Sequence, residues 1–278
     1  MKGISAILIV FSIVVLFLSS PNAFCAGEVK QYKIESKILS DGGETAQRTL
    51  SVYLPEGYNT STASYPVLYL IHGHDGNNTT FLGGGVGFMS EANVSVIVDR
   101  LIQDGKIKPL IVVCPDVNRY WWTGHGRQQL EGIAPYDEYL LHDIVSFVDS
   151  TFRTIPNRES RAIAGHSQGG YDSLYIAISH PEFFSIVGGL SSYGLQTLTQ
   201  KLVALLEGHD EKFNPIRFWL YAGTRDQYGV TQPNRDFVKA LKENGLPTEY
   251  TEDEGGHENK VAQRLGECIE YFSGFLKW

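Results

Sequence analysis

The chain of 278 residues is long enough to bury one large hydrophobic core, and its 42% hydrophobic and 19% charged residues are ordinary for a globular protein. Its formal net charge is −8, and no run of lysine and arginine occurs along the chain. This balance argues against a nucleic acid as partner, because nucleic-acid-binding proteins present a basic patch.

The first residues of the chain have the pattern of a secretory signal peptide. A lysine near the start precedes an apolar stretch over residues 4–18, a Ser-Ser-Pro segment interrupts that stretch, and small residues follow it. We therefore predict a signal peptide over residues 1–26 and a single mature domain over residues 27–278. The mature protein is expected to be secreted or periplasmic, without stable membrane insertion after cleavage.

Two alternatives to simple cleavage remain open at this N-terminus. An uncleaved membrane anchor is one, although the apolar run is short for a helix that spans a bilayer. Lipid modification of Cys25 is the other, and the bulky Phe24 immediately before it argues against that modification.

Only two cysteines remain after cleavage, Cys114 and Cys268. Export would permit a disulfide between them. However, Cys114 ends a predicted buried strand and Cys268 falls in a late helix, and nothing in the sequence indicates that they meet. We expect two buried free thiols.

Strands and helices alternate along most of the mature region. Residues 28–39 and 47–54 alternate between apolar and polar side chains, which predicts two antiparallel strands joined by a turn at residues 41–43. After that, near-continuous apolar runs predict strands buried on both faces. The strands are expected at residues 66–71, 110–114, 161–164, 185–190, 217–221 and 248–251, and helices at residues 90–103, 136–152, 173–178, 234–243 and 258–276. This alternation predicts a mainly parallel sheet covered on both faces, with sites at the carboxyl ends of its strands.

Residues 196–207 form the one helical segment that does not fit this alternation neatly. We expect the ordinary crossover helix between two strands, and a small cap near the site is the alternative.

The segment from Gly165 to Gly169 reads Gly-His-Ser-Gln-Gly and lies between a predicted strand and a predicted helix. A serine on such a sharp strand-to-helix turn presents its hydroxyl at the top of the sheet, and the glycines relieve crowding of the backbone there. The helix N-terminus adds free backbone N–H groups beside a developing negative charge. These features make Ser167 a candidate nucleophile, although the bare pattern also occurs by chance.

A serine hydroxyl needs a neighbouring base, and that base needs a carboxylate to orient it. On this architecture the order along the chain is serine, acid, histidine. Asp226 follows the predicted strand that ends at residue 221, and His257 lies between the last strand and the last helix. Taken alone, each could be an ordinary loop residue. Because all three fall at successive strand ends in the required order, we predict Ser167, Asp226 and His257 as a catalytic triad.

The negative charge that develops on a carbonyl oxygen needs backbone N–H donors. One donor is expected from Gln168, directly after the serine, and the other from His74 in the loop after the first buried strand, where Gly73 allows close approach. The imidazoles of His72 and His74 could also be read as a metal pair. A third ligand is not evident and a serine mechanism needs none, so we predict no metal and no cofactor.

Aromatic side chains are dense in the loop after residues 110–115, where Trp121 and Trp122 are adjacent. Exposed Trp and Tyr at this edge of the sheet could stack on a sugar or aromatic ring, or cover an acyl group. Tyr193, which follows the predicted strand at residues 185–190, is a weaker case. We therefore predict these three residues as substrate-binding, with structural packing as the alternative.

These motifs resemble the putative-esterase family of α/β-hydrolases. That family includes feruloyl and acetylxylan esterases, S-formylglutathione hydrolases, tributyrin-type esterases and mycobacterial mycolyltransferases. The resemblance covers nearly the whole mature chain and is carried by residues 50–58, 67–73, 136–139, 152–154, 161–171, 180–184, 223–226 and 256–257.

The resemblance implies an α/β-hydrolase fold with a mainly parallel, twisted sheet of about eight strands and helices on both faces. It implies Ser167 as nucleophile, Asp226 as acid and His257 as base. It also implies an oxyanion hole from the amides of Gln168 and His74, and no cofactor.

The sequence departs from the family pattern at a few positions. Many members carry Leu and Met around the serine, where this chain has His166 and Gln168, and many carry an aromatic residue where this chain has Asn259. These differences are expected to affect the pocket lining and the choice of substrate more than the reaction type. The signal peptide argues against the cytoplasmic S-formylglutathione branch.

The expected function is that of a secreted serine carboxylesterase acting on a small-molecule or carbohydrate-linked ester through an acyl-serine intermediate. The aromatic loop favours feruloyl or acetyl esters of carbohydrates. An acyltransferase that uses the same triad with a sugar or alcohol acceptor is one alternative. A non-catalytic binding protein with a hydrolase fold is another, and the intact triad argues against it. The sequence specifies neither the acyl and alcohol groups nor the oligomeric state.

Overall fold

The computed structural model describes residues 26–43, 45–85, 92–117, 135–207 and 216–278. Its centre is an eight-stranded sheet with the order β1-β2-β4-β3-β5-β6-β7-β8. The strands are β1 (Glu28–Glu35), β2 (Gln47–Leu54), β3 (Val67–Ile71), β4 (Ile111–Pro115), β5 (Arg161–His166), β6 (Ile186–Leu190), β7 (Arg217–Gly223) and β8 (Thr248–Asp253). The β1–β2 and β2–β4 pairs are antiparallel, and the remaining neighbours are parallel. The predicted mainly parallel sheet of about eight strands is confirmed.

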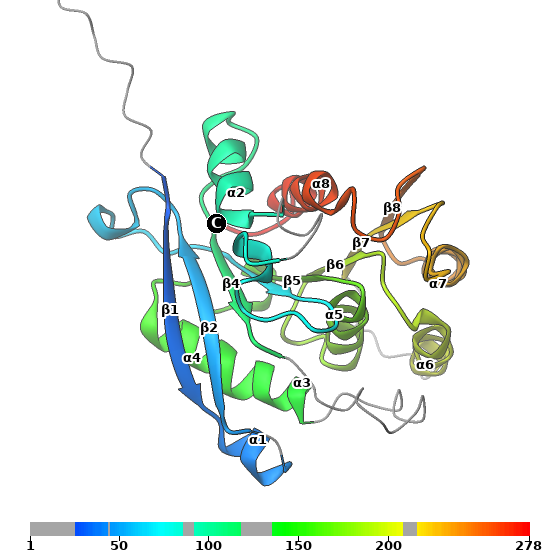
Figure 1. The fold of residues 1–278 in the computed structure, drawn as a ribbon, viewed down its shortest axis with the longest axis horizontal. Helices are drawn as coiled ribbons and strands as arrows, with labels where there is room; N and C mark the ends of the chain where they lie inside the picture. Colours follow the sequence, from blue (N-terminus) through cyan, green and yellow to red (C-terminus); the bar gives the residue numbers. More distant parts are fainter. Residues whose placement is uncertain (1–25, 44, 86–91, 118–134, 208–215) are drawn as a thin grey trace, which may run out of the picture.

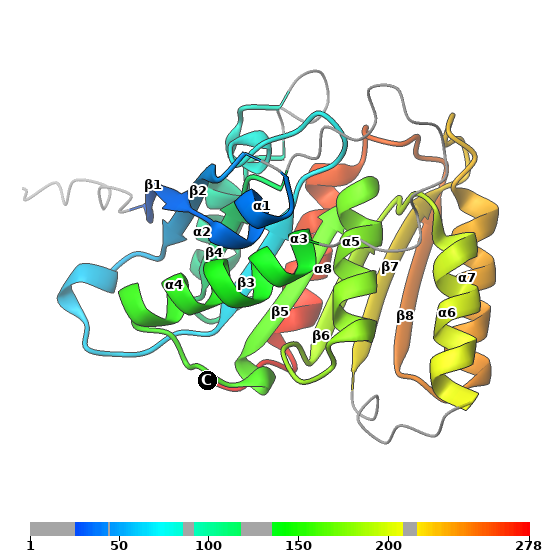
Figure 2. The same cartoon turned by 90° about the horizontal axis from the view of Figure 1, so that it is seen from below.

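Helices cover both faces of this sheet (Figures 1 and 2). One face packs against α2 (Val94–Gln103) and α8 (Val261–Ser273). The other face packs against α1 (Lys37–Asp41), α3 (Tyr136–Glu138), a π-helical turn (Tyr139–Ile144), α4 (Val145–Thr151), α5 (Gln168–Ser179), α6 (Leu195–Glu207) and α7 (Thr231–Glu243). Short 3₁₀ turns lie at Tyr58–Thr60, Thr80–Leu82 and Arg158–Ser160.

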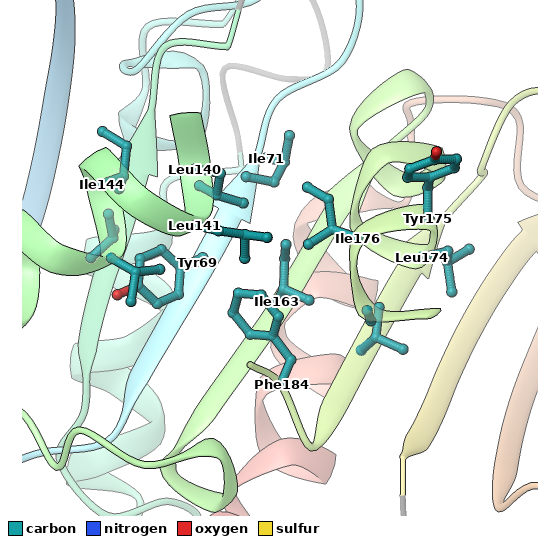
Figure 3. Packing of buried hydrophobic residues seen from close by; sticks show 14 of the residues in the cluster. Tyr69, Ile71, Leu140, Leu141, Ile144, Ile163, Leu174, Tyr175, Ile176 and Phe184 are labelled. Carbon is teal, nitrogen blue, oxygen red and sulfur yellow. The ribbon is translucent and has the colours of Figure 1, made fainter. Parts of the chain in front are cut away.

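The buried side chains form one hydrophobic cluster on each face of the sheet, because successive residues of a strand point to opposite faces. Figure 3 shows part of the larger cluster, in which Leu141 and Ile176 from the helical layer gather around Ile163 of β5. The ring of Tyr69 on β3 meets Phe184 edge-on, with 5.8 Å between ring centroids. Burial on both faces explains why β3 to β6 read as continuous apolar runs in the sequence.

The start of the sheet differs from the prediction in one respect. The antiparallel pairing of β1 and β2 is confirmed, but β1 ends at Glu35, and the expected end of the strand at residues 37–39 lies in the short helix α1. The predicted turn follows this helix at Gly42 and Gly43. The Ser36 side chain caps this helix by accepting the N–H of Leu39 at 3.0 Å, and Leu39 is fully buried. Serine is a preferred N-cap, and a cap that also buries a leucine favours the helix over an extended strand.

The helix α6 is the expected crossover. It joins β6 to β7, which pair in parallel, and it buries Leu195, Leu198 and Leu202 in the larger cluster. A helix whose apolar side chains enter the core covers the sheet, so the cap alternative is wrong.

Two further predictions concern the cysteines and the membrane. Cys114 and Cys268 are both buried and free, as expected, and burial raises the pKa of the Cys114 thiol to about 12. Within the described part of the chain, no helix has the length and hydropathy needed to cross a bilayer. Residues 1–25 of the predicted signal peptide lie outside the described residues.

Candidate active site

Ser167 lies on the turn between β5 and α5 in a strained backbone conformation, with φ 56° and ψ −118°. A non-glycine residue held at positive φ costs about 1–3 kcal/mol and persists only where the surroundings fix it. Four backbone hydrogen bonds do so here. The Ser167 N–H donates to Leu190 O at 2.9 Å, and the Ser167 carbonyl accepts the N–H groups of Gly170 and Tyr193, each at 3.1 Å, and of Tyr171 at 3.2 Å. These hydrogen bonds therefore hold Ser167 in its strained conformation at the carboxyl end of the sheet.

The flanking glycines are required by close packing. An ideal Cβ placed on Gly165 would lie 2.3 Å from the carbonyl oxygen of Gly169, and one on Gly169 would lie 2.3 Å from the carbonyl oxygen of Ile71. Neither contact is sterically allowed, so the Gly-x-Ser-x-Gly pattern marks a strand-to-helix turn.

Asp226 and His257 are brought together from the ends of β7 and β8. The Nδ1 atom of His257 lies 2.7 Å from Oδ2 of Asp226, and the Asp226 side chain is fully buried. The other carboxylate oxygen, Oδ1, accepts the backbone N–H of Tyr228 at 2.9 Å. Because a carboxylate only accepts, this arrangement favours a proton on Nδ1 of His257 and leaves Nε2 as the basic nitrogen.

His166, the residue before Ser167, contacts His257 of this pair. The His166 ring lies beside the imidazole of His257, with 4.7 Å between ring centroids and 57° between ring planes. Its Nε2 atom lies 2.8 Å from the carbonyl oxygen of His257. Ser167, Asp226 and His257 thus follow the carboxyl ends of β5, β7 and β8, which share one edge of the sheet, and their roles as a triad stay predictions.

The loop after β3 also approaches Ser167. An ideal Cβ on Gly73 would lie 3.3 Å from the Cβ of Ser167, so the backbone next to His74 passes close to the serine. Gln168 is the first residue of α5, so its backbone N–H lies at the N-terminus of the helix. This is the arrangement expected of an oxyanion hole, and the donor roles of Gln168 and His74 stay predictions.

The two histidines of this loop do not form a pair. Nε2 of His72 accepts the N–H of Val117 at 3.1 Å, which leaves Nδ1 to donate to the Gly73 carbonyl at 2.8 Å. The His74 ring, by contrast, is 37% exposed and lies 3.3 Å from a carboxylate oxygen of Asp75. His72 therefore holds the loops after β3 and β4 together. Among the described residues, no group of three or more His, Cys, Asp or Glu could hold a metal ion.

Below the His257 loop, a charged network ties β8 to α8. Burial opposes ionisation of Asp253, but its hydrogen bonds with Arg264, with Gly255 N–H at 2.7 Å and with Tyr221 OH at 2.9 Å lower its pKa to about 2. The carboxylate stays ionised at any working pH and holds the first residues of the loop that carries His257.

Two aromatic residues flank the site. Tyr193, which was predicted to bind substrate, is 39% exposed, and its N–H reaches the carbonyl of Ser167. Tyr228 was not predicted: its ring is 59% exposed and meets the His257 imidazole edge-on, with 4.7 Å between ring centroids. Its position two residues after the candidate acid was the available signal. Trp121 and Trp122 lie outside the described residues, so their substrate-binding role stays a prediction.

The chain matches known proteins over most of its length. Residues 45–261 match the family described as "Putative esterase". The chain is 35% identical over 230 residues to an endo-1,4-beta-xylanase/feruloyl esterase of Xylanibacter ruminicola, a match that covers 80% of this chain and 28% of that protein. It is 28% identical over 254 residues to an esterase of Mycobacterium tuberculosis, covering 75% of this chain and 52% of the other. The chain therefore spans about half or less of the length of these two relatives.

Solved structures share the fold. A ferulic acid esterase superposes with a TM-score of 0.73 at 21% identity, covering 90% of this chain and 99% of that one. The S-formylglutathione hydrolase of Staphylococcus aureus superposes with a TM-score of 0.66 at 19% identity, covering 89% and 99%. At these identities the likeness concerns the fold, and it confirms the predicted α/β-hydrolase architecture.

Proposed function

Because the chain belongs to the putative esterase family, we propose that it hydrolyses a carboxylic ester through an acyl-serine intermediate. The observation that carries the proposal is the 2.7 Å hydrogen bond between His257 and Asp226 at the sheet edge where Ser167 occupies its strained turn. A buried carboxylate that orients an imidazole beside a serine is the arrangement that activates a hydroxyl nucleophile.

In the proposed reaction, Oγ of Ser167 attacks the ester carbonyl while Nε2 of His257 takes its proton. Asp226 stabilises the imidazolium that forms and keeps the ring in the required orientation. The backbone N–H groups of Gln168 and His74 stabilise the negative charge on the carbonyl oxygen. His257 then returns the proton to the departing alcohol, and water releases the acid from the acyl-serine by the same steps.

The proposed substrate is a feruloyl or acetyl ester of a carbohydrate. A relative with 35% identity is named as a xylanase/feruloyl esterase. The exposed rings of Tyr193 and Tyr228 at the site provide stacking surfaces for an aromatic acyl group or a sugar. Trp121 and Trp122 are proposed to extend this surface.

The proposed location is outside the cytoplasm, with residues 1–26 removed on export. The test is the N-terminal sequence of the protein recovered from the periplasm or the culture medium. A chain that begins near residue 27 supports export with cleavage, and a chain that retains the apolar stretch over residues 4–18 favours a membrane anchor.

The experiment that tests the proposed function is the Ser167→Ala variant. Because the nucleophile is lost, kcat for p-nitrophenyl acetate and for methyl ferulate should fall by about 10⁴-fold or more. The matched control is Ser150→Ala on α4, which removes an exposed hydroxyl and should leave both activities unchanged. Full activity of the Ser167 variant would contradict the proposal.

Covalent labelling separates the remaining alternatives. A fluorophosphonate probe should label wild-type Ser167 and leave the Ala variant unlabelled. Labelling accompanied by transfer to an added sugar or alcohol, instead of release of free acid, would favour an acyltransferase. No labelling of the wild type would favour a non-catalytic binding protein.

A further inference from the structure

His166 occupies a position that the proposed reaction does not use. It is the last residue of β5 and adjoins Ser167, yet it is only 4% exposed. One side of its ring faces His257, through the 2.8 Å hydrogen bond and the 4.7 Å ring contact. On another side, its Nδ1 lies 3.4 Å from an ideal Cβ on Gly73. One buried ring therefore contacts the loop that carries the base and the loop expected to form the oxyanion hole.

The chemical state of this ring follows from its partner. A carbonyl oxygen only accepts hydrogen bonds, so Nε2 of His166 must carry a proton and donate it to His257. Burial and the neighbouring imidazole of His257 lower the pKa of His166 to about 3. The ring is thus a neutral donor at working pH, and it adds no positive charge that would oppose protonation of His257.

The main chain of His257 makes long-range hydrogen bonds with the side chains of two described residues, Gln227 and His166. Its N–H reaches the side-chain oxygen of Gln227 at 3.4 Å, a long hydrogen bond, whereas its ring is held by Asp226 at 2.7 Å. The 2.8 Å hydrogen bond between His166 Nε2 and the carbonyl oxygen of His257 is shorter than the bond from His257 N–H to Gln227. A 1 Å misplacement of a reacting group can lower a rate by about 10²-fold, so this anchor has consequences for catalysis.

We propose that His166 is a positioning residue that fixes the main chain of His257 through its Nε2–H donor and thereby aligns the base with the neighbouring Ser167. This inference rests on the proposed function for its kinetic consequence. It departs from the expectation that residue 166 lines the pocket and selects the substrate, because the side chain is buried against protein.

The test compares His166→Met with His166→Gln. Met fills a similar volume without a donor, whereas Gln carries an N–H group at a comparable distance from the backbone. With p-nitrophenyl acetate, the Met variant should lose about 10- to 100-fold in kcat with KM changed by no more than about twofold, because the base is displaced and the pocket is not. The Gln variant should recover kcat to within about fivefold of the wild type.

A spectroscopic measurement tests the positioning without any turnover. The proton between His257 Nδ1 and Asp226 should give a downfield NMR resonance that persists in the wild type and the Gln variant and broadens in the Met variant. If Met does not fold, His166→Asn, whose shorter side chain cannot reach the carbonyl, should show the same loss as Met.

The outcomes are distinct. Equal losses of kcat in the Met and Gln variants would overturn the proposal, since packing alone would then explain them, and so would a folded Met variant with wild-type kcat. A wild type that neither hydrolyses esters nor reacts with fluorophosphonate would contradict the proposed function. In that case the downfield resonance still decides on the positioning role.

Discussion

At the scale of single residues, the buried neutral His166 makes stability depend on pH. Its pKa falls from an ordinary 6.5 to about 3 in the folded protein. Below pH 6.5 the unfolded chain binds a proton at this residue while the folded chain does not, so the free energy of unfolding falls as pH drops toward 3. The slope from this one group is about 1.4 kcal/mol per pH unit.

The measurement is urea denaturation of the wild type and His166→Gln between pH 7.5 and 4.5. Other carboxylates and histidines titrate in both proteins, and the comparison cancels them. The wild type should lose about 2–3 kcal/mol more than the Gln variant on going to pH 4.5. Parallel curves for the two proteins would show that His166 titrates normally.

Tyr228 supports a second prediction at this scale. Its ring is largely exposed and contacts the imidazole of His257. Its backbone N–H donates a hydrogen bond to Asp226, and any substitution keeps that donor. Tyr228→Ala should raise KM for methyl ferulate about three- to tenfold, as expected for the loss of one aromatic contact, and should leave KM for ethyl acetate nearly unchanged. Tyr228→Phe should behave as the wild type. Equal changes for the two esters would instead indicate that the ring supports His257 and not the substrate.

At the scale of elements, Asp253 connects the end of β8 to α8 at the start of the loop that carries His257. Asp253, the last residue of β8, interacts with Arg264 of α8 and with the hydroxyl of Tyr221 on β7. Asp253→Asn removes the charge and keeps the shape, and should lower the free energy of unfolding by about 1–2 kcal/mol, since the group is partly exposed and screened. Asp104→Asn on the surface is the matched control and should have little effect.

The direction of the pH dependence follows from the lowered pKa of Asp253, which is about 2. The contribution of ionised Asp253 to the free energy of unfolding is present above the ordinary aspartate pKa near 4 and is lost as pH falls from about 4 to 2. Acid denaturation of the wild type in that range should therefore be steeper than that of the Asn variant. Identical acid transitions would mean that the Arg264 contact contributes nothing to stability.

Elements also differ in how far the sequence predicts them. Strands β3 to β7 were predicted within a few residues, because burial on both faces leaves a local apolar pattern. Helix α1 was not predicted, because its cap Ser36 also donates to Asp143, 107 residues away, and only the folded chain brings the two together. Sequence patterns record burial well and long-range polar contacts poorly.

The same distinction applies to the candidate site. Asp226 and His257 were predicted by their order and by their position at strand ends, which parallel topology brings to one edge. His166 and Tyr228 were not, because their roles depend on ring contacts with His257 that no spacing encodes. His166 is 91 residues away from its hydrogen-bond partner.

At the scale of the whole molecule, β6 determines how closely the two helical layers approach the sheet. An ideal Cβ on Gly188 would lie 2.7 Å from Sγ of Cys268 and 2.9 Å from the ring of Phe272, both on α8. An ideal Cβ on Gly189 would instead lie 2.4 Å from Oγ of Ser192 and 3.0 Å from Leu174 on α5, the helix that follows Ser167. Two consecutive glycines on a central strand therefore admit α8 on one face and α5 on the other.

Gly188→Ala tests this arrangement. The added methyl group overlaps the side chains of Cys268 and Phe272 and must displace them or α8, so the free energy of unfolding should fall by about 1–3 kcal/mol in urea denaturation. The matched control is Gly266→Ala on α8, where the nearest atom, Cγ2 of Ile97, lies 3.6 Å from an ideal Cβ, an ordinary contact. There the same methyl group should stabilise the protein by about 0.5–1 kcal/mol, because alanine favours a helix interior more than glycine does. Opposite signs for one substitution at two positions would demonstrate that close packing on β6 holds α8 against the sheet, and a neutral Gly188→Ala variant would show that α8 can shift without loss.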